Sequence, residues 1–365
     1  MRHIYPGAEK FLFAVVLSTF LANSVMAQTA VTIEGVIDTF IGSMRSSGDV
    51  ARTTKIDGSG MTTSWIGFKG SEKLGKDMQA DLALAAYFRP DTGESGRFPG
   101  DTLFSRAANV GLSGSFGALS LGRAAAPSTF SILRFNPFGN GPSFSPLAMH
   151  LNIPLLNASK WGNSLAGDTG WSNQIRYTIP AAKDLSINLH YQFGETADNT
   201  ADNTADNNKG NIGADLLYMG SPLSLTAFFH HVEINNPLNV PVGVVKSVAG
   251  LKAARQTAWF IGAAYDFKSA KLFGTYDQTA HDIDLHDKTC SIGITVPTGM
   301  NEFKAAWAQT RRNGTGISDR QRDTMAIGYA YKPSKRSYLY LVVMHDKIST
   351  FESGSSIATG VQHRF

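Results

Sequence analysis

Apolar and polar residues alternate with a period of two through most of the chain from Thr29 onward. In the clearest stretch, 185–193, every odd residue is apolar or aromatic and every even residue is polar. Successive side chains of a β-strand point to opposite faces, so this pattern predicts strands with one apolar and one polar face. Helical periodicity is nearly absent. The chain is therefore expected to be all-β.

The alternating segments are about ten residues long, which is the length of a tilted strand that crosses a membrane. About sixteen such segments can be placed, an even number, as in bacterial single-chain outer-membrane barrels. We predict a 16-stranded antiparallel transmembrane β-barrel. The candidate strands are 30–43, 61–71, 78–89, 105–113, 117–123, 171–180, 184–194, 211–219, 222–233, 256–267, 270–280, 288–296, 300–311, 322–332, 335–347 and 356–365.

Short and long connections alternate between these segments. The short ones are rich in turn residues and lie at 73–76, 115–116, 180–183, 220–221, 268–269, 297–299 and 333–334. Periplasmic turns and extracellular loops of a membrane barrel alternate in this way. One long connection repeats Thr-Ala-Asp-Asn from Thr196. Its acidic residues match no calcium-loop spacing, so a solvated loop is favoured.

One connection, segment 124–170, is long and apolar. It holds five Gly, five Pro and only three formal charges, Arg134, Lys160 and Asp168. It also carries four Phe and one Trp, and shows no sustained helical or strand period. Disordered segments are poor in aromatic residues, so this one is expected to pack against something. A long ordered loop can narrow the inside of a barrel.

The first 27 residues resemble a secretory signal. Basic Arg2 and Lys10 precede an apolar run over 11–22, and 25–27 form a small-residue cleavage site. A membrane anchor is the alternative, but a run of about a dozen residues is short of the ~20 that a helix needs to span a bilayer. We expect cleavage after Ala27, which leaves 28–365 as one barrel domain.

Composition excludes several classes of protein. Charged residues make up 17% of the chain and the net charge is only +4, which does not indicate nucleic-acid binding. Cys290 is the single cysteine, so no intrachain disulfide forms.

Several motifs together resemble the general diffusion porins of Gram-negative outer membranes, most closely those of β-proteobacteria. They are VTIEGVID at 31–38, IGFKGSEKLG at 66–75, VGLSGSFG at 110–117, LGR at 121–123 and GVQHRF at 360–365. The resemblance covers essentially all of 28–365. It implies a homotrimer of 16-stranded barrels, each a water-filled pore whose inward-folded third loop, here segment 124–170, forms the constriction. It also implies outer-membrane lipid and lipopolysaccharide as surroundings, and Phe365 as the assembly signal for the barrel assembly machinery.

Two positions depart from that family pattern. Trp65 stands where such porins commonly carry Arg, on the same inward parity as Lys69. Asp168 is the only acid of segment 124–170, although the constriction loop often presents several. Charge selectivity is therefore argued from the residues themselves.

Strand parity predicts which charges line the pore. The inward cations and anions are Lys69, Arg89, Arg176, Lys304, Glu34, Asp38 and Asp81, joined by Trp65 and by the loop residues Arg134 and Asp168. Parity places Arg106 and Arg123 with the outward apolar residues unless Gly122 or a strand end bends the register. The balance of loop and wall charge predicts a positive field and a modest anion preference.

No catalytic constellation stands out, and no enzyme activity, cofactor or metal is predicted. His190 and the pair at 230–231 lack a nucleophile elbow. The histidines and acids of 281–287 lack zinc-ligand spacing. The predicted function is passive diffusion of small polar solutes through a channel. The alternatives are a solute-specific channel of the same fold and a surface adhesin or receptor that uses the long loops.

Overall fold

The computed structural model describes residues 30–139, 141–151, 168–194, 210–233, 255–281, 284–314 and 317–365. The leader predicted for 1–27, the repeat from Thr196, and Lys160 lie outside these residues. The described chain is almost entirely β, with two short helices, α2 (Pro127–Arg134) and α3 (Pro146–Leu151).

The strands agree closely with the alternating segments of the sequence. They are β1 (Ala30–Met44), β2 (Thr53–Gly58), β3 (Trp65–Lys73), β4 (Met78–Tyr87), β5 (Ala107–Gly114), β6 (Gly117–Ala125), β7 (Gly170–Ile179), β8 (Leu185–Phe193), β9 (Gly210–Tyr218), β10 (Leu223–Val232), β11 (Gln256–Asp266), β12 (Lys271–His281), β13 (Leu285–Thr298), β14 (Asn301–Gly314), β15 (Ile317–Tyr331), β16 (Ser337–Ile348) and β17 (Gly354–Arg364).

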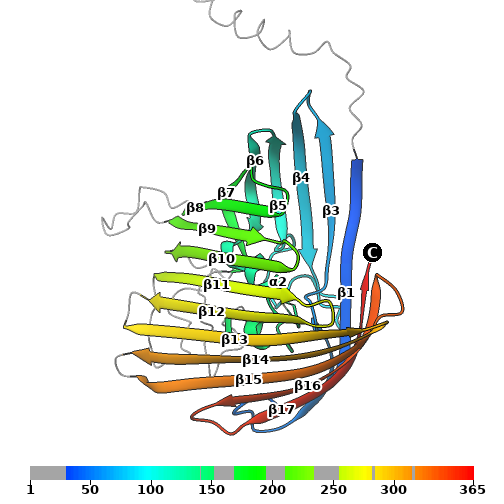
Figure 1. Ribbon diagram of the computed structural model, residues 1–365, viewed down its shortest axis with the longest axis vertical. Helices are drawn as coiled ribbons and strands as arrows, with labels where there is room; N and C mark the ends of the chain where they lie inside the picture. Colours follow the sequence, from blue (N-terminus) through cyan, green and yellow to red (C-terminus); the bar gives the residue numbers. More distant parts are fainter. Residues whose placement is uncertain are drawn as a thin grey trace, which may run out of the picture.

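The strands form one closed antiparallel barrel. From β3 onward each strand pairs with the next, and β17 pairs with β1 to close the ring. β2 pairs with 39–44 of β1, whereas β3 pairs with 30–36, so these two segments share one position in the wall. The 17 strand segments therefore occupy 16 positions, which confirms the predicted 16-stranded barrel. Figure 1 shows this ring, with the carboxyl end of the chain beside β1.

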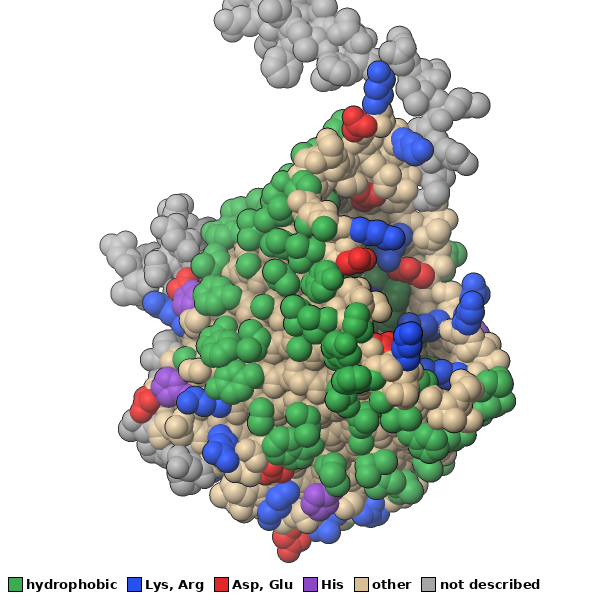
Figure 2. All heavy atoms as spheres, in the orientation of Figure 1, with side chains coloured by type: hydrophobic (Ala, Val, Ile, Leu, Met, Phe, Trp, Pro, Cys, Tyr) green, Lys and Arg blue, Asp and Glu red, His purple; other side chains and the backbone are tan. Residues whose placement is uncertain are grey.

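The outer face of the wall is apolar. On β1, Ile33 is 61% exposed, while the neighbouring inward residues Val36 and Asp38 are buried. On β13, Ile292 is 62% exposed and Ser291 is buried. Figure 2 shows hydrophobic side chains spread over the outer wall, with charged ones toward its margins. An apolar outer band around a polar interior is the arrangement of a barrel that faces lipid. Among the described residues, no helix has both the length and the hydropathy needed to cross a membrane.

The described part of segment 124–170 packs on inward-facing side chains of the wall. Helix α2 contacts β9 and β10, and α3 contacts β13, β14 and β15. The sequence suggested no helical period here, and the two helices have only 8 and 6 residues. Helices of about two turns repeat an apolar face too few times for the period to show.

A bulge near the end of β6 turns Arg123 away from the lipid. The register of β6 on β7 shifts between Gly122 and Ala124. Gly122 has φ +117°, a backbone conformation that favours glycine. Arg123 is consequently buried at 8% exposure instead of following the outward Leu121. This is the bend on which the inward placement of Arg123 depends.

Candidate channel constriction

Helix α2 is attached to the wall by polar and apolar contacts. Pro127 lies in its first turn, where a missing N–H leaves no helical hydrogen bond unmade. The Oγ atom of Ser131 is 2.7 Å from Oγ1 of Thr226 on β10. Ile132 is fully buried in a cluster with Phe228 and Phe260 of the wall. One face of α2 is thus packed against the inner wall of the barrel.

The turn after α2 is organised by the side chain of Asn136. Its amide nitrogen donates to the carbonyls of Ile132 and Gly139, at 2.6 and 2.8 Å. Its amide oxygen accepts from the backbone N–H of Phe138 at 2.8 Å and from the hydroxyl of Ser145 at 3.0 Å. A buried amide with all these partners rigidifies the turn.

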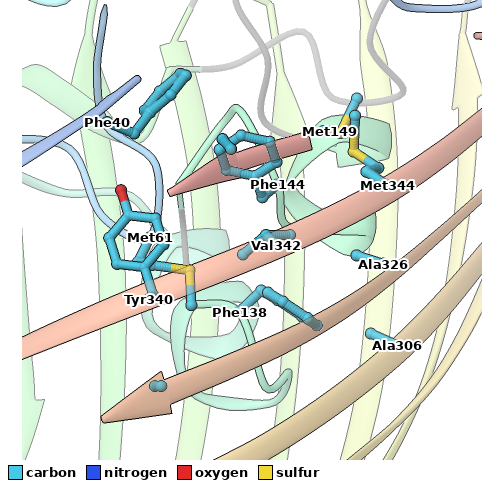
Figure 3. Packing of buried hydrophobic residues seen from close by; sticks show 12 residues of the cluster. Phe40, Met61, Phe138, Phe144, Met149, Ala306, Ala326, Tyr340, Val342 and Met344 are labelled. Carbon is cyan, nitrogen blue, oxygen red and sulfur yellow. The ribbon is translucent and has the colours of Figure 1, made fainter. Parts of the chain in front are cut away.

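The tip of the segment packs into the inner face of β15, β16 and β17. Figure 3 shows Phe138, Phe144 and Met149 beside Tyr340 and other inward side chains. The rings of Phe144 and Phe40 meet edge to face, with centroids 5.0 Å apart. Burial of aromatic rings of this size contributes several kcal/mol in aggregate, of the order of 1.5–3 per side chain. The tip is therefore part of the core.

Two wall cations bind backbone carbonyls of the segment. Lys304 Nζ donates to the carbonyl of Pro137 at 3.0 Å, and Arg322 donates to that of Met149 at 3.2 Å. Glu302 and Asp346 balance these cations at 2.9 Å in each case. Lys304 points inward as predicted, but it serves as an anchor for the segment.

His150 fastens α3 to the wall as a neutral ring. Its two ring nitrogens lie 2.7 and 2.9 Å from the hydroxyls of Thr310 and Thr324. Burial, followed by the charge of Arg322, holds the pKa of His150 well below its ordinary value. One nitrogen then donates and the other accepts.

Asp168 lies at the exit of the segment, inside a cluster of compensating charges. It pairs with both Arg97 and Arg123, and Asp101 pairs with Arg97 at 2.8 Å. Burial raises the pKa of Asp168, but the two guanidinium groups outweigh it and hold the pKa below its ordinary value. Two arginines and two aspartates leave this cluster neutral. Asp168 therefore presents no free charge to the channel. Arg97 was not predicted from the sequence, because it lies in a loop and not in an alternating strand.

Asp38 is inward, as parity predicts, but it is completely buried. Its carboxylate accepts hydrogen bonds at 2.6–3.1 Å from the backbone N–H groups of residues 60–62 and from the side chains of Tyr340 and Gln362. These bonds hold the connection between β2 and β3. They explain why the predicted strand 61–71 begins only at Trp65.

Four other predicted wall charges have local partners. Lys69 and Glu34 form an ion pair at 2.6 Å with side-chain exposures of 61% and 35%. Arg89 pairs with Glu94 at 2.6 Å. Asp81 accepts from Gln79 at 2.6 Å and from Ser113 at 2.5 Å, both neutral.

Three predicted cations have no carboxylate within ion-pair distance among the described residues: Arg106, Arg134 and Arg176. Arg134 is exposed at the end of α2. Arg176 faces inward on β7, opposite Ser120. Arg106 precedes β5, and its guanidinium lies over the ring of Trp65. Figure 2 shows a hollow on one side of the molecule with Lys, Arg, Asp and Glu side chains at its rim.

The histidines that were weighed as catalytic candidates have structural partners. His190 lies between Gln174 and Asp215, at 3.0 and 2.7 Å, and no hydroxyl of the described residues bonds to it. His230 contacts Gln256 at 3.2 Å. In 281–287, Asp287 pairs with Arg312 at 2.6 Å, whereas Asp282 lies outside the described residues.

Residues 13–350 match the sequence model of the Gram-negative porin family. The chain belongs to this family. It is an outer-membrane porin, a water-filled barrel through which small hydrophilic solutes and ions diffuse passively.

Similar proteins are named as outer membrane porins, and the similarity extends over nearly the whole length of each chain. An outer membrane porin protein of Bordetella pertussis is 27% identical over 98% of this chain and 100% of its own length. Outer membrane porin protein 32 of Delftia acidovorans is 25% identical over 94% of this chain and 96% of its own. Among solved structures, an anion-selective porin from Comamonas acidovorans superposes with a TM-score of 0.70, at 24% identity and with 93% and 100% of the two chains covered. OmpT of Vibrio cholerae in a trimer form has a TM-score of 0.66 at 12% identity, with 92% and 99% covered.

Proposed function

We propose that segment 124–170 narrows this porin and that the aperture prefers anions. The described part of the segment packs on β9, β10 and β13–β17. The solute path then runs between the segment and the opposite wall, where β1 and β3–β7 present Glu34, Lys69, Asp81 and Arg176. The solved Comamonas porin of the same fold is anion-selective, which supports the proposal.

The charge balance of this path carries the proposal. Arg106, Arg134 and Arg176 have no carboxylate within ion-pair distance among the described residues, and Asp215, which attracts Arg176 from farther away, is bonded to His190. Asp38 and Asp168 are fully engaged by donors. Asp81 is the counterweight, because its partners are neutral. The part of the segment outside the described residues, 152–167, has Lys160 as its single charged residue. A positive excess at a narrow, low-dielectric rim raises the local anion concentration.

A salt gradient of potassium chloride across a planar bilayer tests this preference. We expect a reversal potential of the sign for anion preference. Arg134→Gln or Arg176→Gln should each lower the anion-to-cation permeability ratio by roughly two- to fivefold, the effect of one charge at channel distance. Raising the salt concentration should weaken the difference through screening.

Arg311→Gln is the matched control, because Arg311 is an exposed residue of β14 between the inward Thr310 and Arg312. It should leave the ratio unchanged. A cation preference of the wild-type channel would overturn the proposal, and Asp81 and Glu34 would then be the residues to replace.

We further propose a homotrimer in the outer membrane, exported after cleavage of a leader at 1–27. Support comes from the apolar outer faces of the strands and from the trimer form of the Vibrio porin. Lipopolysaccharide and the barrel assembly machinery are the proposed partners, and Phe365 the proposed assembly signal. Gly35 and Phe365 exchange backbone hydrogen bonds of 3.1 Å across the closing seam.

Deletion of Phe365 is expected to lower the amount of porin in the outer membrane severalfold, because it removes both the terminal ring and these two seam bonds. Immunoblots of fractionated membranes, unheated and heated, measure the level and the heat-modifiable oligomer. Phe365→Tyr keeps an aromatic terminus and should accumulate normally. Equal levels for the deletion and the wild type would rule out Phe365 as the signal, and a monomer in gently extracted, unheated membranes would rule out the trimer.

A further inference from the structure

Trp65 and Arg106 form a stacked pair on the channel side of the wall. Trp65 begins β3, and the next residue, Ile66, is 38% exposed on the outer face, so Trp65 points inward. The guanidinium carbon of Arg106 lies 4.0 Å from the centroid of a Trp65 ring. Arg106 also donates to the hydroxyl of Tyr87 at 3.3 Å, and Tyr87 is the cross-strand neighbour of Trp65. The pair therefore has fixed support on two sides.

The wall is shaped to let the indole lie along it. A Cβ added to Gly67 would come within 3.2 Å of the Trp65 ring and 2.8 Å of Ala85 Cβ. A residue larger than glycine at 67 would therefore crowd both the wall and the ring. The backbone N–H of Arg106 is also fixed, because it donates to the carbonyl of Ala85 at 3.2 Å.

This stack engages the flat face of the guanidinium and leaves donors at its edge. Tyr87 is the one hydrogen-bond partner of the Arg106 side chain among the described residues. Lys69 and Arg89, which are inward by parity, and the loop residue Arg97 each have a carboxylate partner. Arg106 is thus a half-buried charge held in place between two rings, and its remaining edge donors have no protein partner among the described residues.

A guanidinium edge recognises flat oxyanions. Its N–H groups form a rigid fork that matches the two oxygens of a carboxylate, whereas a spherical chloride gains only the charge. Holding the fork still in advance lowers the entropy lost when the anion binds.

We propose that Arg106 forms a binding site for small carboxylates in the channel, and that Trp65 is the positioning residue that holds Arg106 in place. The proposal rests on the anion preference proposed above, and it assigns the solute class. Trp65 then contributes to selectivity by orienting a cation from the connection that precedes β5.

Single-channel conductance as a function of concentration tests the proposal, with full-length porin in planar bilayers bathed in potassium acetate or potassium chloride. A binding step makes acetate conductance saturate. We expect Trp65→Ala to raise the half-saturating acetate concentration by about two- to fivefold, the effect of losing an exposed cation–π contact. The half-saturating chloride concentration should change less. Trp65→Phe keeps a ring and should restore most of the acetate binding.

Arg106→Lys separates shape from charge, because lysine keeps the charge but has no planar fork. It should weaken acetate saturation and leave the potassium chloride reversal potential near that of wild type. Identical acetate saturation in wild type, Trp65→Ala and Arg106→Lys would overturn the proposal. An equal shift for acetate and chloride in Trp65→Ala would also overturn it, because Arg106 would then act only as a point charge. The wild-type reversal potential reports on the proposed anion preference separately.

Discussion

Replacing Asp168 with alanine is expected to lower the free energy of unfolding of the barrel by about 3–5 kcal/mol, since two buried guanidinium groups lose their shared carboxylate. The side chains of Arg97 and Arg123 are only 11% and 9% exposed, so water cannot replace the missing charge. Arg123 is also held by the carbonyl of Ser105 at 2.6 Å and therefore cannot swing out to solvent freely. The variant should unfold at lower urea concentration in lipid vesicles, as followed by tryptophan fluorescence.

Glu94→Gln is the control for this experiment. It also removes one carboxylate from an arginine, but Glu94 is 58% exposed. Exposed ion pairs contribute at most about 1 kcal/mol. A loss for Asp168→Ala no larger than the loss for Glu94→Gln would contradict the role of Asp168 as the centre of a buried charge cluster.

The same cluster predicts a pH dependence of stability. Arg97 and Arg123 outweigh burial and hold the pKa of Asp168 below the ordinary value of 3.8. A carboxyl whose folded pKa is depressed stabilises the fold above its unfolded pKa and loses that contribution as the pH falls through the folded pKa. The wild-type barrel should therefore lose stability below about pH 4, and Asp168→Asn should lack this part of the pH dependence.

Replacing Asp38 with asparagine is expected to lower the free energy of unfolding by about 1.5–3 kcal/mol, the range for hydrogen bonds to a charged group. The amide nitrogen of Asn would face N–H donors that now point at a carboxylate oxygen. The effect should reach the channel, because Asp38 holds Met61, and the Met61 carbonyl accepts from Gly141 of segment 124–170 at 3.2 Å. Single-channel records of Asp38→Asn should therefore show more current noise than the wild type.

Tyr340→Phe is the matched control, because it removes one donor from Asp38 and keeps the ring in its buried cluster. Its cost should be about 1 kcal/mol, a typical single hydrogen bond. Quiet channels and unchanged stability in Asp38→Asn would show that the connection over 60–62 is held by other contacts.

Period-two alternation in the sequence predicted the wall of this porin well. Strand number and strand order agree with the structure, and the burial of Asp38 fits the inward direction that parity gives it. The prediction succeeded because side-chain direction along a strand depends only on local backbone geometry. The single wall position that it misplaced is the one divided between β2 and β3, where Asp38 binds the intervening connection.

The environment of each charge could not be read from the sequence. Asp168 looks like the one free acid of its segment, yet its partner Arg97 lies 71 residues earlier in a loop without any periodicity. Arg123 has outward parity, and a bulge at Gly122 turns it inward. Lys304 has inward parity, but closure of the barrel brings it to a carbonyl 167 residues away.

The sequence by itself thus determined the barrel and, except at the bulge beside Arg123, the side of the wall on which the strand residues lie, because both follow from a pattern repeated every two residues. Only the tertiary structure decided which charges remain available to a solute. Ion pairs and hydrogen bonds join residues that are brought together when the strands close into a ring and segment 124–170 folds against the wall, and the strength of each contact depends on burial that no local pattern encodes.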